Sequence, residues 1–253
     1  MQKPEARSIY WLPLLESFDS SVFIAEDKQE QAVCGFVLML ALIYNDLRDI
    51  MFLLNLHLKD EPKIPKNIST EAGHYAGLNL HGIRLIQMSI YETLYLIKGR
   101  QATIDHPLFQ STIQALGKKD KQCWSDLINA ATNKPDQEIN QFREFLDTIR
   151  DKITAHYVGI DQLVQGYKLN FFDRADQKPL DAYISRGSKM SESRFYFADA
   201  AVQGLVKTHL TENENEFRDK MREYVGNINR AIYSIVEKFI NNVRGAAWVK
   251  HET

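Results

Sequence analysis

The sequence predicts an all-α protein, a helical bundle of four to five long helices with one small irregular or β-hairpin insertion. Three observations support this fold class. Long stretches contain few helix breakers, their apolar residues recur at helical spacing, and aromatic residues mix with polar ones mainly at about 167–198. Because neither a repeat nor a linker divides the 253 residues, we expect residues 1–253 to form a single domain.

The first long helix is expected over residues 27–60. Apolar residues are so frequent in it that we expect most of its circumference to be covered. Its leucines include Leu38, Leu42, Leu53 and Leu56. Pro62 and Pro65 follow and end the helix, because each proline disfavours helical backbone in the residue before it.

A second long helix is expected to follow the N-cap signal at Ser69 and Thr70 and to run to Lys98. Its apolar residues keep a helical spacing at Ile83, Ile86, Ile90, Leu94 and Ile97. Gly77 and Gly82 either weaken the start of this helix or mark close packing against a neighbour.

Shorter helices are predicted at 107–116 and 121–131, followed by a helix over about 136–158 and a final long helix over about 212–244. Residues 167–198 differ from all of these, since aromatics there mix with charged residues, serine and proline. We expect 167–172 and 194–197 to form either a small hairpin or an ordered loop.

Composition restricts the function and the compartment. The formal net charge of −2 gives no overall attraction to nucleic acid, so any RNA contact must come from a local patch. Cys34 and Cys123 both read as small buried hydrophobes, without a disulfide or metal spacing.

The start of the sequence lacks the apolar core of a signal peptide, and the longest apolar run is shorter than the roughly 20 residues that span a bilayer. We therefore expect a cytoplasmic protein that does not cross a membrane.

The helix expected around residue 150 carries two basic side chains at the edge of an apolar stripe. At 100° per residue, one face collects Ile139, Phe142, Leu146, Ile149, Ile153, Tyr157 and Ile160. Arg150 and His156 lie on opposite borders of this face, separated by about 120° of rotation and about 9 Å of rise. A second copy packed on the stripe would bring two Arg–His pairs into one cleft that suits a phosphate. The structural alternative is that Arg150 pairs with a carboxylate and His156 caps its own helix.

Residues 142–157, FREFLDTIRDKITAHY, resemble the signature helix of the HEPN superfamily. Those proteins are α-helical bundles, usually dimeric, whose hallmark is an arginine, four to six residues, and a histidine. Five residues separate Arg150 from His156, and Asp151 stands where the family often has Asn, Asp or His. The segment looks most like the abortive-infection branch. Toxins that pair with a nucleotidyltransferase antitoxin often have Tyr two residues after the histidine; here that position is Val158, with Tyr157 beside it.

This resemblance implies a metal-independent endoribonuclease that acts as a homodimer and uses no cofactor. His156 would assist proton transfer to or from the 2′-hydroxyl and the leaving 5′-oxygen, and the product would carry a cyclic phosphate. Arg150 would stabilise charge on the scissile phosphate. Asp151 and Tyr157 would support Arg150 and His156. Some members of the superfamily only bind RNA or assist assembly.

Further candidates lie outside the motif. Asn45 and Asp46 interrupt the first long helix and either support Arg150 or form an exposed stripe. Arg186 and Lys189 lie near aromatic residues, so they either grip single-stranded RNA or belong to a solvated loop.

A metal site is not expected. Glu71 and His74 have a Glu-x-x-His spacing, but a second copy of it is missing, and a carboxylate-bridged site in a helical bundle needs two.

Two functional hypotheses remain. The first is an HEPN-like ribonuclease or RNA-binding protein, in bacterial stress or antiviral (phage) defence. The second is a helical dimerisation or scaffold protein without chemistry. The nuclease hypothesis requires Arg150 and His156 to be reachable from solvent, whereas the scaffold hypothesis has them paired and packed away.

Overall fold

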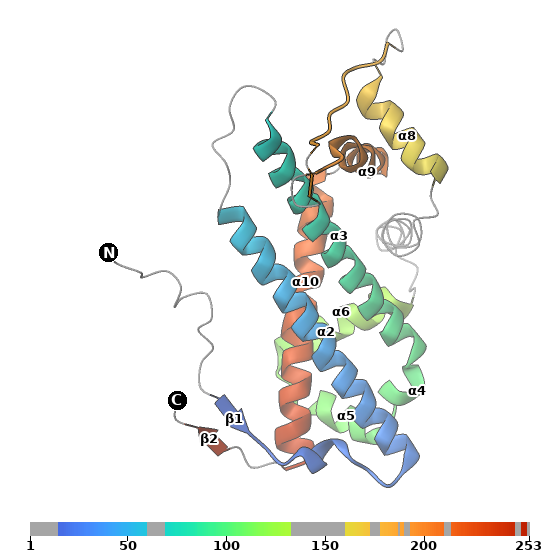
Figure 1. Ribbon diagram of the computed structural model, residues 1–253. Coiled ribbons are helices and arrows are strands. Elements are labelled where there is room, and N and C mark those ends of the chain that lie inside the picture. The colour runs from blue at the N-terminus through green and yellow to red at the C-terminus, as the bar shows by residue number, and fades with distance from the viewer. Residues whose placement is uncertain are drawn as a thin grey trace, which may run out of the picture.

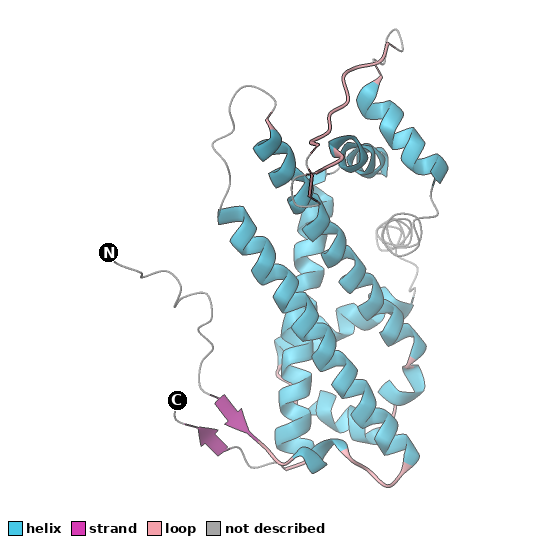
Figure 2. Ribbon diagram, viewed as in Figure 1, coloured by secondary structure: helices cyan, strands magenta, loops and turns pink. Residues whose placement is uncertain are grey.

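The computed structural model confirms the all-α helical bundle (Figures 1 and 2). It describes residues 15–59, 69–132, 160–172, 178–186, 188–189, 193–209, 214–245 and 249–251. Every structural statement below concerns these residues.

Three long helices lie side by side and form the body of the bundle (Figure 1). They are α2 (Lys28–Lys59), α3 (Thr70–Gly99) and α10 (Glu214–Lys238). A shorter helix, α6 (Lys118–Thr132), packs against both α10 and α3. These helices confirm the predictions for residues 27–60, 69–98, 121–131 and 212–244, the last of which ends in the π-helix η4 (Phe239–Val243).

Helix ends follow local signals. The Ser69 hydroxyl accepts the backbone N–H of Ala72 at 3.1 Å and caps α3. Between α3 and α6 lie α4 (Gln101–Ile104) and the predicted α5 (Pro107–Gln114). His106 caps α5 by accepting the Leu108 N–H at 3.2 Å on Nδ1, and Pro107 fits the first turn because its missing N–H would have no helical partner there.

The core fills the space that these helices share. Its largest fully buried side chains are Phe109, Phe239, Leu40, Ile90, Ile97, Leu127, Ile228, Ile232 and Ile235. The Phe109 ring packs edge-on against Phe36 at 5.3 Å and lies 5.7 Å from the Trp124 ring, so α5 closes one end of the core. Cys34 is buried as predicted. Cys123 is only half-buried, which corrects the prediction, and desolvation raises the pKa of its thiol.

The expectation that α2 is covered around most of its circumference is wrong. Leu38, Leu42 and Leu53 are 46%, 53% and 64% exposed. The reason is geometric, because α3 and α10 pack on one side of α2 and bury residues such as Leu40 and Leu47 there. Leu38, Leu42 and Leu53 lie outside this packed side of the helix.

The segment 167–198 is more helical than predicted. It begins inside α8 (Ile160–Phe171) and ends inside α9 (Tyr196–His209), and these two helices pack against each other. Neither the hairpin of 167–172 with 194–197 nor an ordered loop over 167–172 is therefore correct, because residues up to Phe171 are helical. The described residues between the helices are irregular and include two isolated antiparallel bridges, Phe172 with Pro179 and Ser185 with Arg194.

Close backbone approach explains how α8 and α9 pack. A Cβ on Gly204 would overlap the Gly166 carbonyl, so glycine at 204 lets the two helices come together. Tyr167 and Phe171, four residues apart on α8, lie 4.7 Å apart between ring centroids in a tilted arrangement, and Tyr167 also meets the Phe197 ring of α9 edge-on at 6.4 Å.

The two ends of the described chain pair with each other. Strand β1 (Leu15–Ser17) runs antiparallel to β2 (Val249–His251), and the 3₁₀ helix η1 (Ser20–Phe23) connects β1 toward α2 (Figure 2). After η4, Gly245 has a φ of 65°, which a side chain would disfavour, and turns the chain toward β2. Arg244 fixes this end, since its guanidinium donates to the Cys34 sulfur at 3.0 Å.

Two leucines of α2 test the burial pattern. We expect Leu40→Ala to lower the free energy of unfolding by about 2–5 kcal/mol, because Leu40 is fully buried. Leu42→Ala should change it by no more than about 0.5 kcal/mol, because that side chain is 53% exposed. Urea unfolding of the two variants measures the difference, and equal losses would contradict the placement of α2.

Candidate functional site

The predicted catalytic motif lies outside the described residues. Arg150, Asp151, His156 and Tyr157 all fall between residues 133 and 159, together with the helix predicted over 136–158. The described chain resumes at Ile160, where α8 begins. The roles assigned to the motif therefore stay predictions.

Asn45 and Asp46 lie on α2, and both are exposed. An exposed polar group is satisfied by water, so these two residues need no buried partner. Their exposure agrees with the reading of this segment as a polar stripe. Whether either side chain supports Arg150 stays a prediction, because Arg150 lies outside the described residues.

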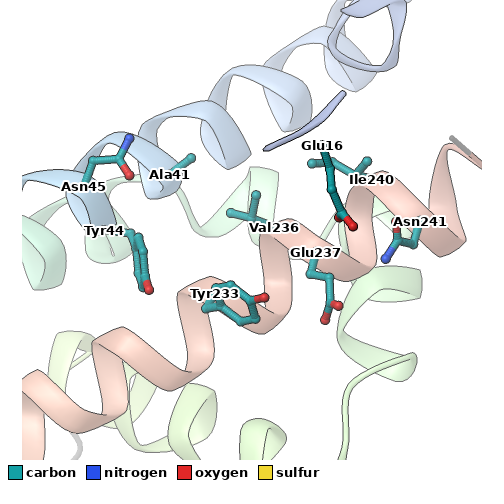
Figure 3. Close-up of a pocket in the computed structure, with 9 residues that line it drawn as sticks. All are labelled: Glu16, Ala41, Tyr44, Asn45, Tyr233, Val236, Glu237, Ile240 and Asn241. Atoms are coloured by element: carbon teal, nitrogen blue, oxygen red, sulfur yellow. The ribbon is translucent and has the colours of Figure 1, made fainter. Parts of the chain in front are cut away.

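Asn45 also lines a pocket of about 500 Å³ where β1, α2, α10 and η4 meet (Figure 3). Most of its wall is apolar. The full lining is Glu16, Ala41, Tyr44, Asn45, Tyr233, Val236, Glu237, Ile240 and Asn241. The Tyr44 and Tyr233 rings lie 6.0 Å apart between centroids and form one side of it.

The charged side chains of this pocket are carboxylates. Glu16 and Glu237 both border it (Figure 3). Lys238, which is not part of the lining, approaches the Glu237 carboxylate at 3.8 Å. Two carboxylates beside an apolar wall repel anions. The pocket is therefore a poor place for the phosphates of RNA.

Arg186 and Lys189 lie in the irregular segment between α8 and α9, and both are exposed. Of the aromatics near them, Tyr183 and Phe195 are 41% and 60% exposed. Tyr196 is instead engaged with α3, since its hydroxyl donates to the Thr70 carbonyl at 3.1 Å. Stacking surface for a base is thus present at two of the three aromatics, and RNA binding there stays a prediction.

Glu71 and His74 are both exposed at the start of α3. The described residues include no group of three or more His, Cys, Asp or Glu side chains able to hold a metal ion. None of the helices in the described part of the chain combines the length and apolarity that crossing a bilayer requires.

The sequence reading missed a basic cluster where α3 meets the start of α9. The Arg194 side chain lies against Gly77, where a Cβ would overlap the guanidinium, and the Tyr196 ring lies against Gly73. The Arg194 Nε and Nη2 atoms each lie 3.0 Å from Asp199 Oδ2. Gly77 therefore marks close packing against a neighbour, which was one of its two predicted meanings.

His81 lies one helical turn beyond Gly77 on the same face of α3. Its Nδ1 is 3.5 Å from Nη2 of Arg84. Partial desolvation holds the pKa of His81 below its ordinary value of 6.5, and the positive charges of Arg84 and Arg194 lower it further, while Asp199 opposes them. These interactions therefore favour the neutral imidazole over the protonated one.

Comparison of the chain with family models, with curated proteins and with solved structures gives no match.

The lowered pKa of His81 predicts how stability depends on pH. Between pH 6.5 and the lower pKa of the folded state, the unfolded chain binds more protons than the folded one. This contribution to stability is complete above about pH 6.5 and declines as the pH falls through that window. We expect His81→Gln to remove this part of the dependence. Urea unfolding of both proteins over a pH series measures it, and parallel curves would contradict the assignment.

Proposed function

We propose that this chain is an HEPN-like, metal-independent endoribonuclease or RNA-binding protein that acts as a cytoplasmic homodimer in stress or phage defence. One observation carries the proposal, the Arg150 and His156 pair within a segment that resembles the HEPN signature helix. The all-α bundle supports it, because that is the fold the resemblance implies.

The proposed reaction is an internal transfer at phosphorus. The 2′-oxygen attacks the adjacent phosphorus as its proton passes to a base, and the bond to the 5′-oxygen breaks as that oxygen receives a proton. His156 serves in these proton transfers because its pKa range lies near neutrality. Arg150 stabilises the added negative charge with its planar set of donors. Asp151 orients either residue, and a two-fold dimer supplies a second Arg–His pair to the same cleft.

A scaffold protein without chemistry is the alternative, and the surface of α2 favours it. Leu38, Leu42 and Leu53 are exposed at positions that share one side of the helix. Exposed apolar residues gathered on one face often mark a protein interface. In this alternative Arg150 pairs with Asp147 or another carboxylate, and His156 packs away from solvent.

Cleavage of a mixed RNA pool in the presence of EDTA tests the nuclease proposal. We expect the wild-type protein to cleave, and His156→Ala and Arg150→Ala to lose at least about 100-fold in rate, because general acid–base and charge stabilisation each contribute that much. His74→Ala and Arg222→Ala are matched controls, since both native side chains are exposed, and they should keep the wild-type rate.

Two outcomes would contradict the proposed nuclease activity of Arg150 and His156. If no protein in the set cleaves RNA while all unfold at the wild-type temperature and share one oligomeric state, the scaffold alternative takes its place. If the two motif variants cleave as well as their controls, the activity belongs to another site.

A further inference from the structure

The basic cluster at the α3–α9 junction is assembled from one face of α3 and the chain around the start of α9. Gly77, His81 and Arg84 share that face because residues four and three apart on a helix are neighbours. Arg194 reaches the same face from the irregular segment and fills the space over Gly77. Arg84 thus lies next to the His81 imidazole, and Arg194 lies over the preceding turn of the same helix face.

Arg194 is held in place and still has donors to offer. Asp199 accepts from Nε and Nη2, and both side chains are about four-fifths buried, at 22% and 23% exposed. Among the described residues, no acceptor takes the N–H groups of Nη1. A guanidinium fixed by a carboxylate on one edge can present its remaining donors without losing further side-chain freedom.

Arg84 lacks such a carboxylate. The residue is half-buried, and its Nε is shielded from solvent and has no hydrogen-bond acceptor. Among the described residues, the one hydrogen-bonding contact of its guanidinium is with His81. A shielded donor on a charged group without a counter-ion is unfavourable. The arrangement gains free energy if an anion reaches Arg84.

We propose that His81, Arg84 and Arg194 form a binding site for a phosphate group. Two guanidinium groups against the single carboxylate of Asp199 leave one net positive charge when His81 is neutral, and two when it is protonated. Planar guanidinium groups suit the oxygens of phosphate, to which they can donate in pairs. The site is separate from Arg150 and His156 in the sequence, and it does not depend on the proposed ribonuclease activity.

The same chemistry is offered by a free phosphate compound and by the backbone of a polynucleotide. Both present tetrahedral phosphate oxygens to the cluster. They differ in charge and in attached groups, so separate probes can distinguish them. Lys189 and Arg186 belong to the same irregular segment as Arg194 and would favour the longer ligand.

The pKa of His81 gives a direct readout of phosphate binding, because the charged groups that act on it are known. These are Arg84 on its own helix, and Arg194 and Asp199 from the chain around the start of α9. A bound phosphate favours the protonated imidazole and counteracts the two arginines. The experiment follows the pKa of His81 by NMR on the full-length protein, with inorganic phosphate as the probe and chloride at equal ionic strength as the reference.

We expect phosphate to raise the pKa of His81 saturably, whereas chloride should leave it unchanged. Arg84→Gln and Arg194→Gln should abolish the phosphate response, and Arg222→Gln, which removes an exposed arginine elsewhere, should keep it. In a second arm, an oligoribonucleotide without terminal phosphates replaces inorganic phosphate. A response to both probes assigns a polynucleotide backbone, and a response to inorganic phosphate alone assigns a small phosphate compound.

The proposal is overturned if neither probe moves the pKa of His81, or if Arg84→Gln responds like the wild type. Thermal unfolding of each variant shows whether it is folded. If Arg194→Gln fails to fold because its contact with Asp199 is lost, Arg84→Gln decides alone. Since no readout involves RNA cleavage, failure here leaves the proposed nuclease untouched, and the reverse also holds.

Discussion

The shared burial of α2, α3 and α10 is the interaction on which the rest of the structure depends. Each helix contributes fully buried side chains to one core, and α10 alone supplies Ile228, Ile232 and Ile235. Helices in folded proteins gain most of their stability from such tertiary packing. The helix α6 and the short helix α5 attach to this body, and the β1–β2 pair ties its two chain ends together. The α8–α9 pair joins it chiefly through α3.

The described structure contains two regions that differ in charge. The pocket beside β1 is bordered by carboxylates, whereas the junction of α3 with α9 brings together His81, Arg84 and Arg194. Figure 1 shows β1 toward one end of the bundle and α9 toward the other. The small net charge of −2 is therefore compatible with a local separation of charge among the described residues.

Local signals predicted the long helices well. Ser69 caps α3 by the hydrogen bond expected of it, and α2 ends at Lys59, shortly before the two prolines. The sequence could not say which face of α2 would find a partner, since Leu40 and Leu42 are chemically identical and differ only in what packs on them. Mixed aromatic and polar residues indicated a loop or hairpin where α8 and α9 form, because their mutual packing is a tertiary effect that periodicity does not contain.

The candidate sites were harder to predict than the helices, because they depend on contacts between residues far apart in the sequence. Gly77 was a sign of close packing, but nothing local showed that Arg194, more than a hundred residues later, would fill the space above it. The β1–β2 pairing likewise joins the two ends of the chain. For Arg150 and His156 the sequence predicts chemistry through the resemblance of one short segment, and the proposed two-fold cleft requires a second copy of the chain. The proposed roles of Arg150 and His156 are therefore best tested by the reaction products.

The most direct test of the central claim is the identity of the RNA ends that the wild-type protein produces with EDTA present. Mass spectrometry of the fragments distinguishes the possible ends. The account predicts a 2′,3′-cyclic phosphate on one fragment and a 5′-hydroxyl on the other, since the 2′-oxygen is the nucleophile. Fragments with a 3′-hydroxyl and a 5′-phosphate would contradict it, because they require water to attack in place of the 2′-oxygen.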